Sequence, residues 1–308
     1  MPQWGPFLAV VSVLTVLLLV LARQSQQLIS EQADSGRAGN DKQLAGEQTD
    51  PPASTPERTA GDETGASGGI DSPGGAESGA PEGVTLPDST QTPGTDTPAG
   101  GLELTSRAML ANVASTQALF AGVVVAAAWY FSIPVAAFGV TAGSPTAGLR
   151  AVLLGIGFGS VLWLANELAT TVAGAVGAAY DESVRRLLAP ESTGGWVGLL
   201  LVVLPLVALA EELLFRAALI GVPTAGFDVS PWPLAVVASV AFALGHGAQG
   251  RVGVLVTGLL GLVLATGYIL TGSLLVVVVA HYVINALEFL LHELLDVETV
   301  WSFAVRSG

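Results

Sequence analysis

Charged and polar residues interrupt the apolar second half of the chain at three places, and their side chains could carry out hydrolysis. The first of these positions is the run 196–222, whose only charged residues are Glu211, Glu212 and Arg216. A charge at the centre of a bilayer costs about 2.5–3.5 kcal/mol on insertion scales. Something must therefore compensate these three charges if the run lies in a membrane.

Helical spacing separates the two glutamates. Glu212 and Arg216 are four residues apart, so they share a helix face and are predicted to pair. Glu211 points about 100° away and has no partner within its own turn. An unpaired carboxylate inside a membrane is a candidate functional group. The alternative is a structural ion pair, with Glu211 at a water-exposed helix end.

The other two places each hold a pair of residues four apart. Phe242 and His246 lie in FALGH, and His281 and Asn285 lie in HYVIN. Taken alone, such a histidine is an ordinary interior residue, and a His–Asn pair is an ordinary hydrogen bond between membrane helices.

Together these residues are suited to activating water. A carboxylate such as Glu211 takes the proton, and imidazole and amide groups stabilise the oxyanion. Alternatively, Glu211, His246 and His281 form a His₂Glu set for Zn²⁺, with water as the fourth ligand. The third histidine of the chain, His292, is expected at the membrane interface with Glu288 on its face.

The elements that position these residues are predicted to be membrane helices. The chain is 51% hydrophobic and 12% charged, with a mean hydropathy of +0.63. An open sheet edge cannot face hydrocarbon, and the apolar runs do not alternate as barrel strands do. Gly155, Gly157 and Gly159 predict close helix packing. The predicted spans, of which 232–248 is short enough to be partial or tilted, are 108–131, 149–174, 196–220, 232–248, 252–271 and 273–295.

The predicted fold is an all-α integral membrane protein of about seven transmembrane helices, a core bundle of six plus an N-terminal anchor. Residues 1–22 are the anchor, 23–106 an acidic disordered linker and 107–300 the catalytic domain. A signal peptide cleaved after Ala22 is the alternative, although no Lys or Arg precedes the apolar run and Arg23 follows it. The linker holds 14 Asp and Glu against 4 Lys and Arg, with few apolar residues to offset its ordering entropy.

Charge usage bears on partners and orientation. Lys42 is the only lysine, and this acidic, Lys-poor composition resembles that of proteins from halophilic archaea. The sequence has no basic patch of the kind that binds nucleic acid. The excess of loop arginines predicts a cytoplasmic linker and C-terminus. Arg150 is expected on the outer side, and the inner side collects Arg23, Arg107, Arg185, Arg186, Arg251 and Arg306.

The ordered triple EELLFR, FALGH and HYVIN resembles the CPBP intramembrane proteases, which include the CAAX prenyl endopeptidases and Abi-type proteins. The resemblance implies an all-helical bundle that hydrolyses peptide bonds of membrane-associated substrates. A metal has been discussed for this family, and the residues leave open both a metalloprotease with Zn²⁺, which the two histidines and one carboxylate slightly favour, and a metal-free route. It implies that Glu211 activates water with help from His246, and that His281 and Asn285 complete the oxyanion or metal site. Supporting roles fall to Glu212, Arg216 and Phe242.

Two other functions remain open at this point. Intramembrane Glu and His also build proton-coupled transporters and relays. Many transporters carry internal repeats, and the chain has no second copy of the Glu-Glu or His-x-x-x-Asn pattern. A non-catalytic scaffold of the bacteriocin-immunity kind would keep all the motif residues, so the motifs do not exclude it.

Overall fold

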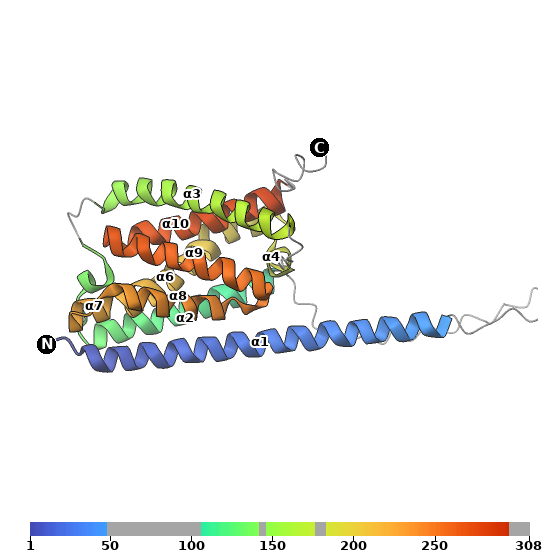
Figure 1. Ribbon diagram of the computed structural model, residues 1–308, viewed down its shortest axis with the longest axis horizontal. Helices are drawn as coiled ribbons and strands as arrows, with labels where there is room; N and C mark the ends of the chain where they lie inside the picture. The colour runs from blue at the N-terminus through green and yellow to red at the C-terminus, as the bar shows by residue number, and fades with distance from the viewer. Residues whose placement is uncertain (48–105, 142–145, 176–182, 296–308) are drawn as a thin grey trace, which may run out of the picture. The chain divides into compact units, whose positions relative to one another are not determined.

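The computed structural model describes residues 1–47, 106–141, 146–175 and 183–295. Every element in these ranges is a helix, as predicted (Figure 1). In chain order they are α1 Trp4–Glu47, α2 Ser106–Tyr130, η1 Val135–Phe138, α3 Gly148–Ala175, α4 Ser183–Leu188, α5 Thr193–Gly198, η2 Leu199–Val203, α6 Leu204–Glu212, η3 Leu213–Gly221, α7 Val222–Phe227, α8 Pro231–Gly245, η4 Gly247–Gln249, α9 Gly250–Thr271, α10 Leu274–Glu288 and η5 Phe289–Leu294.

Six helical stretches in the described ranges are long and apolar enough to cross a membrane. The fourth runs from α5 through α7, and Pro223, where the π-helical segment η3 passes into α7, does not end it. It therefore ends later than the predicted residue 220. As predicted, α8 is shorter than a full span. The six spans are Trp4–Gln24, Ser106–Tyr130, Gly148–Ala175, Thr193–Phe227, Gly247–Thr271 and Leu274–Leu294.

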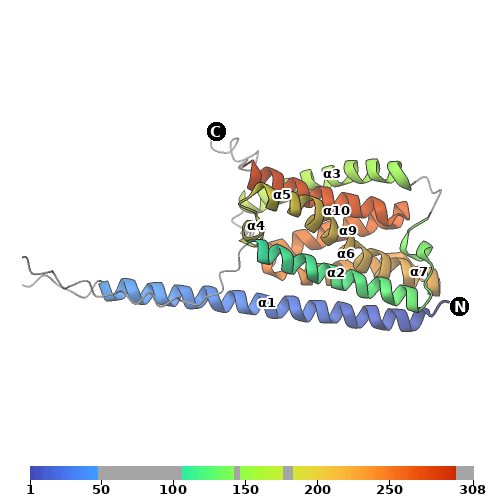
Figure 2. The same cartoon turned by 180° about the vertical axis from the view of Figure 1, so that it is seen from behind.

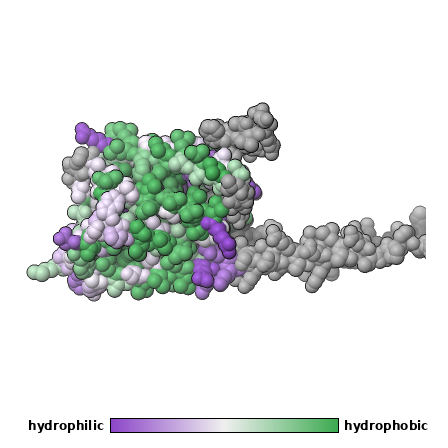
Figure 3. Space-filling model, viewed as in Figure 1, coloured by the Kyte–Doolittle hydropathy of each residue, from purple (hydrophilic) through white to green (hydrophobic). Residues whose placement is uncertain are grey.

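The surface agrees with a membrane environment. Figure 3 shows a broad hydrophobic band over the helices, with hydrophilic residues gathered toward the two ends of the bundle. Large apolar side chains such as Trp129, Leu201 and Val237 are more than 60% exposed. In water such a surface would drive association, whereas lipid tails cover it without cost. The chain is thus a multi-pass membrane protein.

The N-terminal helix differs from the prediction. α1 continues to Glu47, past the expected anchor end at Ala22, so the first part of the predicted linker is helical. The segment 23–47 contains no proline, and the next prolines in the sequence are Pro51 and Pro52. Residues 1–35 belong to the same compact unit as the bundle. The rest of the predicted linker, 48–105, lies outside the described residues.

Glycines bring α3 against α10 (Figures 1 and 2). A Cβ on Gly155 would lie 2.8 Å from the carbonyl oxygen of Val276, and one on Gly159 would lie 2.5 Å from that of Ala280. The close packing predicted for these two glycines is therefore confirmed. The prediction is wrong for Gly157, which faces open space. The contact fixes the part of α10 that carries the His-x-x-x-Asn motif.

Hydrogen bonds and an ion pair show which helix ends lie at the same end of the bundle. At one end Gln3 donates its N–H to Phe131 O over 2.9 Å, and Thr146 Oγ1 donates to Thr271 O over 2.9 Å. These bonds join the start of α1 to the end of α2, and the start of α3 to the end of α9. At the opposite end α4 is bound to η5 by an ion pair of 2.8 Å between Arg185 and Glu293. The loops therefore lie at the two ends of the bundle in the grouping that the number of predicted spans implies.

Candidate active site

The two adjacent glutamates stand where α6 passes into the π-helical segment η3. Glu212 is fully buried and accepts from Arg216 Nη1 over 2.7 Å, as predicted. Arg216 is 1% exposed, donates from Nη2 to Gly261 O over 3.0 Å, and lies 4.5 Å above the ring of Phe242. The buried charge is thus met by a carboxylate, a carbonyl and an aromatic face.

Glu212 also holds His281 of α10. The Nδ1 atom of His281 lies 2.8 Å from Glu212 Oε1, across 69 residues of sequence. A carboxylate oxygen accepts, so Nδ1 carries the hydrogen in this bond. In the neutral ring Nε2 is then an acceptor, and it lies 3.7 Å from Glu211 Oε2.

His246 is fixed in the same way. It caps the C-terminal end of α8, and its Nδ1 lies 2.8 Å from Phe242 O. A carbonyl only accepts, so Nδ1 again donates and Nε2 of the neutral ring is left as an acceptor. That Nε2 lies 4.0 Å from Glu211 Oε2. The Phe242 and His246 rings are 4.5 Å apart, which confirms that they share a face.

Glu211 is the poorly satisfied member of the group. Its Oε1 accepts one long bond of 3.4 Å from Gln117 Nε2 on α2. Its Oε2 is buried and has no hydrogen-bond partner. Two imidazole nitrogens with available lone pairs therefore face a carboxylate oxygen with available lone pairs. Such an arrangement suits a water molecule or a cation that is shared by all three atoms.

Glu211 lines a cavity of about 330 Å³. Asn285 lines this cavity one helical turn after His281, so all four residues predicted to be catalytic border one space. Apolar side chains form most of the remaining wall. A cavity of this size accommodates a short stretch of peptide backbone with its side chains.

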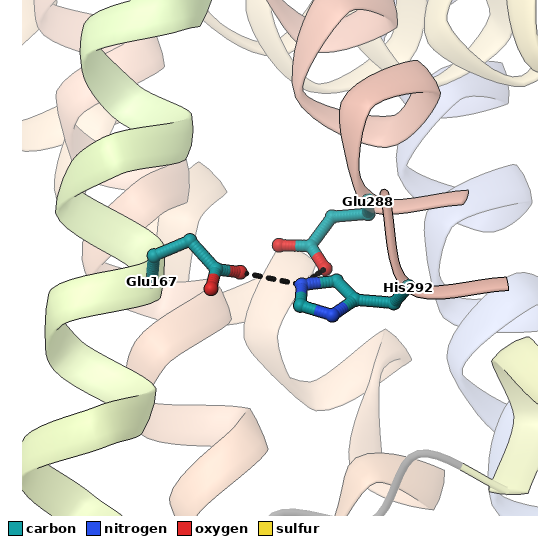
Figure 4. Close-up of side chains that lie close together, drawn as sticks. All are labelled: Glu167, Glu288 and His292. Atoms are coloured by element: carbon teal, nitrogen blue, oxygen red, sulfur yellow. Dashed lines mark hydrogen bonds and ion pairs between the residues drawn. The ribbon is translucent and has the colours of Figure 1, made fainter. Parts of the chain in front are cut away.

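Among the described residues, one group of three has ligand atoms that all lie within 4.8 Å of one another, and one of its members, Glu288, also lines this cavity. The group consists of Glu167 on α3 with Glu288 and His292 (Figure 4). His292 Nε2 lies 2.8 Å from Glu167 Oε1 and 3.7 Å from Glu288 Oε2. Asn166 and Arg185 also bond Glu288, over 2.6 and 3.0 Å. A metal ion could therefore be held here, although its ligands already form an ion-paired network.

The predicted metal set was Glu211, His246 and His281. The ligand atoms of these three residues do not all lie within 4.8 Å of one another. Each imidazole nevertheless has the surroundings of a metal ligand. A carboxylate or a backbone carbonyl holds Nδ1, and Nε2 points to the shared oxygen. The donor types fit zinc, whereas the spacing would require one imidazole to move toward the other.

Sequence reasoning missed several polar neighbours. Gln117, Asn166 and Glu167 are polar residues within apolar runs, and that signal was available in the sequence. The contact of Glu212 with His281 had no local signal, because it joins two helices. His292 was placed with Glu288, and that contact exists, but its closest partner is Glu167.

Comparison with known proteins identifies the segment that builds this site. The family model for Rce1-like proteins, type II CAAX prenyl endopeptidases, matches residues 193–287. No curated protein and no solved structure matches the chain. The matched stretch runs from α5 into the end of α10 and includes all three motifs. Residues 193–287 are therefore similar to the Rce1-like type II CAAX prenyl endopeptidases, which agrees with the resemblance carried by the order of the motifs.

Proposed function

We propose that this protein is a membrane endopeptidase in which Glu211 activates water against a peptide bond. One observation carries the proposal. The buried Oε2 of Glu211 has no hydrogen-bond partner and faces two imidazole Nε2 atoms, at 3.7 and 4.0 Å. The family match supports membrane endopeptidase activity in general.

In the proposed hydrolysis each residue has a separate role. A water molecule donates one hydrogen to Glu211 Oε2 and the other to an imidazole Nε2, of His246 or His281. Glu211 takes a proton as the water oxygen bonds to the carbonyl carbon. The Asn285 amide donates to the oxyanion that forms. Glu211 then returns the proton to the amide nitrogen as the C–N bond breaks, which leaves a carboxylic acid and an amine; proton transfer between them gives a carboxylate and an ammonium group.

The central experiment is cleavage of membrane-inserted peptides by the purified protein in lipid vesicles. The wild type should cleave and Glu211→Ala should not, with both proteins equally folded. A wild type that cleaves no peptide, but moves protons across the vesicle membrane in a Glu211-dependent way, would favour the transporter. Inactivity in both assays would favour the scaffold.

We also propose zinc as a second form of the same site. Glu211, His246 and His281 would hold the ion, which when bound would lower the pKa of a coordinated water to about 7. The observation in favour is that both Nδ1 atoms are bonded outward, as in metal-ligating histidines.

Metal analysis of the purified protein separates these forms. His246→Gln should abolish zinc binding if the ion lies at the catalytic site, and His292→Gln should abolish it if the ion lies with Glu167 and Glu288. Full activity after chelation, at sub-stoichiometric metal, would eliminate the zinc form and leave water activation by Glu211.

The substrate in this proposal is a membrane-associated peptide or protein. The mostly apolar cavity wall suits residues that leave the bilayer at the cavity. The arginines also favour one orientation. Five of them lie at or near the ends of helices or membrane spans on the α4 side, and Arg150 lies in the first turn of α3 at the opposite end; the five are Arg23, Arg107, Arg185, Arg186 and Arg251. By the positive-inside rule the α4 end faces the cytoplasm.

A further inference from the structure

The turn that follows α8 is held in place by the N-terminal helix. The side-chain amide of Gln26, oriented with Oε1 toward the turn, accepts from the N–H groups of Gly247 and Ala248 over 3.2 and 3.3 Å. This turn begins directly after His246. Gln26 lies outside the segment 193–287 that matches the family.

These two N–H groups need a partner from elsewhere in the chain. His246 ends α8 and begins the short 3₁₀ turn η4. The first N–H groups of a helical turn have no acceptor within it, and a capping side chain normally supplies one. No side-chain hydrogen bond from His246 caps η4. Gln26 supplies the acceptor from another helix.

The glycines on both sides of His246 lie against the N-terminal helix, and at Gly247 there is no room for a side chain. A Cβ on Gly247 would lie 2.5 and 2.6 Å from the two terminal atoms of the Gln26 side-chain amide, closer than real contacts allow. A Cβ on Gly245 would lie 3.6 and 3.9 Å from the Cδ2 atoms of Leu18 and Leu19. The backbone of the histidine is thus packed against α1 before and after the catalytic side chain.

We infer that Gln26 is a positioning residue for His246, and that α1 is therefore a working part of the peptidase site. The inference rests on the proposed function, in which His246 holds water against Glu211. His246 Nε2 lies 4.0 Å from Glu211 Oε2, a distance that one water molecule can bridge. A loosened turn would change this distance, whereas the apolar wall that α2 and η2 supply would keep its place.

The test compares Gln26→Ala with Gln24→Ala, the same change at an exposed position of the same helix. The first readout does not depend on protease activity. Diethyl pyrocarbonate acylates neutral imidazoles, and mass spectrometry follows each of the three histidines separately. Gln26→Ala should raise the acylation rate of His246 by about tenfold, as expected for the loss of one or two hydrogen bonds. The rate at His281 should not change.

The second readout is peptide cleavage. Gln26→Ala should lower kcat by about tenfold with KM unchanged, since misplacement by about 1 Å can cost about 100-fold. Gln24→Ala should match the wild type. Gln26→Glu keeps an acceptor oxygen at the same reach and should restore most of the rate. If Gln26 had a merely structural role, Gln26→Ala would lower the amount of folded protein, but it would not lower kcat selectively at an unchanged KM.

A double-variant cycle checks the contact itself. Gly247→Ala should impair cleavage because its Cβ meets the Gln26 amide, and Gly247→Ala combined with Gln26→Ala should be no worse than Gln26→Ala alone. Unchanged His246 acylation in Gln26→Ala would overturn the inference, as would altered acylation with unchanged kcat. If the wild type cleaves nothing, altered acylation would retain the positioning of His246 and only the proposed function would fail.

Discussion

Adjacent residues of one type have different surroundings in this protein. Glu212 is fully buried, and its Oε1 is shared by Arg216 and His281 over 2.7 and 2.8 Å. Glu211 keeps a buried oxygen without a partner. Glu212 therefore fixes its neighbours, and in the proposed mechanism it is Glu211 that reacts.

Glutamine at each of the two positions should separate these roles. Glu211→Gln keeps the size of the side chain and removes the proposed base. The kcat should therefore fall by about 10²–10⁴-fold, with little change in the unfolding temperature. Glu212→Gln leaves Arg216 buried without its counter-charge, and breaking a buried pair typically costs about 3–5 kcal/mol. Its main effect should be a lower unfolding temperature in detergent. Equal rate losses at equal stability would contradict the division.

Contacts within one helix could be predicted from spacing alone. The pairs Glu212–Arg216 and Phe242–His246 are four apart, and both exist in the structure. Contacts between helices could not be predicted, because spacing gives a residue's face but not the helix that packs against it. The bond from His281 to Glu212 belongs to this second kind.

At the scale of helices, the packing of α3 on α10 sets the position of His281. Gly159 meets the carbonyl of Ala280, the residue immediately before His281. The glycine pattern predicted close packing but not its partner, and it did not distinguish Gly157, which points away. A single sequence holds no record of which face of α3 is turned inward.

Alanine at each of these two glycines tests the packing. Gly159→Ala should destabilise the protein by about 1–3 kcal/mol, because the added Cβ forces the helices apart. Cleavage should fall as His281 moves. Gly157→Ala adds a Cβ in open space and should be neutral or stabilising by up to about 1 kcal/mol. Thermal unfolding in detergent measures both variants, and equal losses at the two sites would show that the helices do not meet here.

At the scale of the molecule, the arginines predicted which loops share an end, and hydrogen bonds agree with that grouping. Because the sequence has no cysteine, single cysteines can test which end is cytoplasmic. Ser67→Cys in the acidic segment should be protected from an impermeant maleimide in intact cells. Thr141→Cys, after η1, should be labelled. The reverse pattern would invert the proposed orientation.

The length of α8 has a consequence for the surrounding lipid. Its 15 residues span about 22 Å, against about 30 Å for a typical hydrocarbon core. The bilayer beside α8 must thin, or polar groups must enter it, at an end of this helix, and His246 lies at one of its two ends. Such thinning would shorten the path of water to Glu211. Proteolysis should therefore be faster in vesicles of short-chain phosphatidylcholine than in those of long-chain phosphatidylcholine, so that membrane thickness itself sets the rate of cleavage.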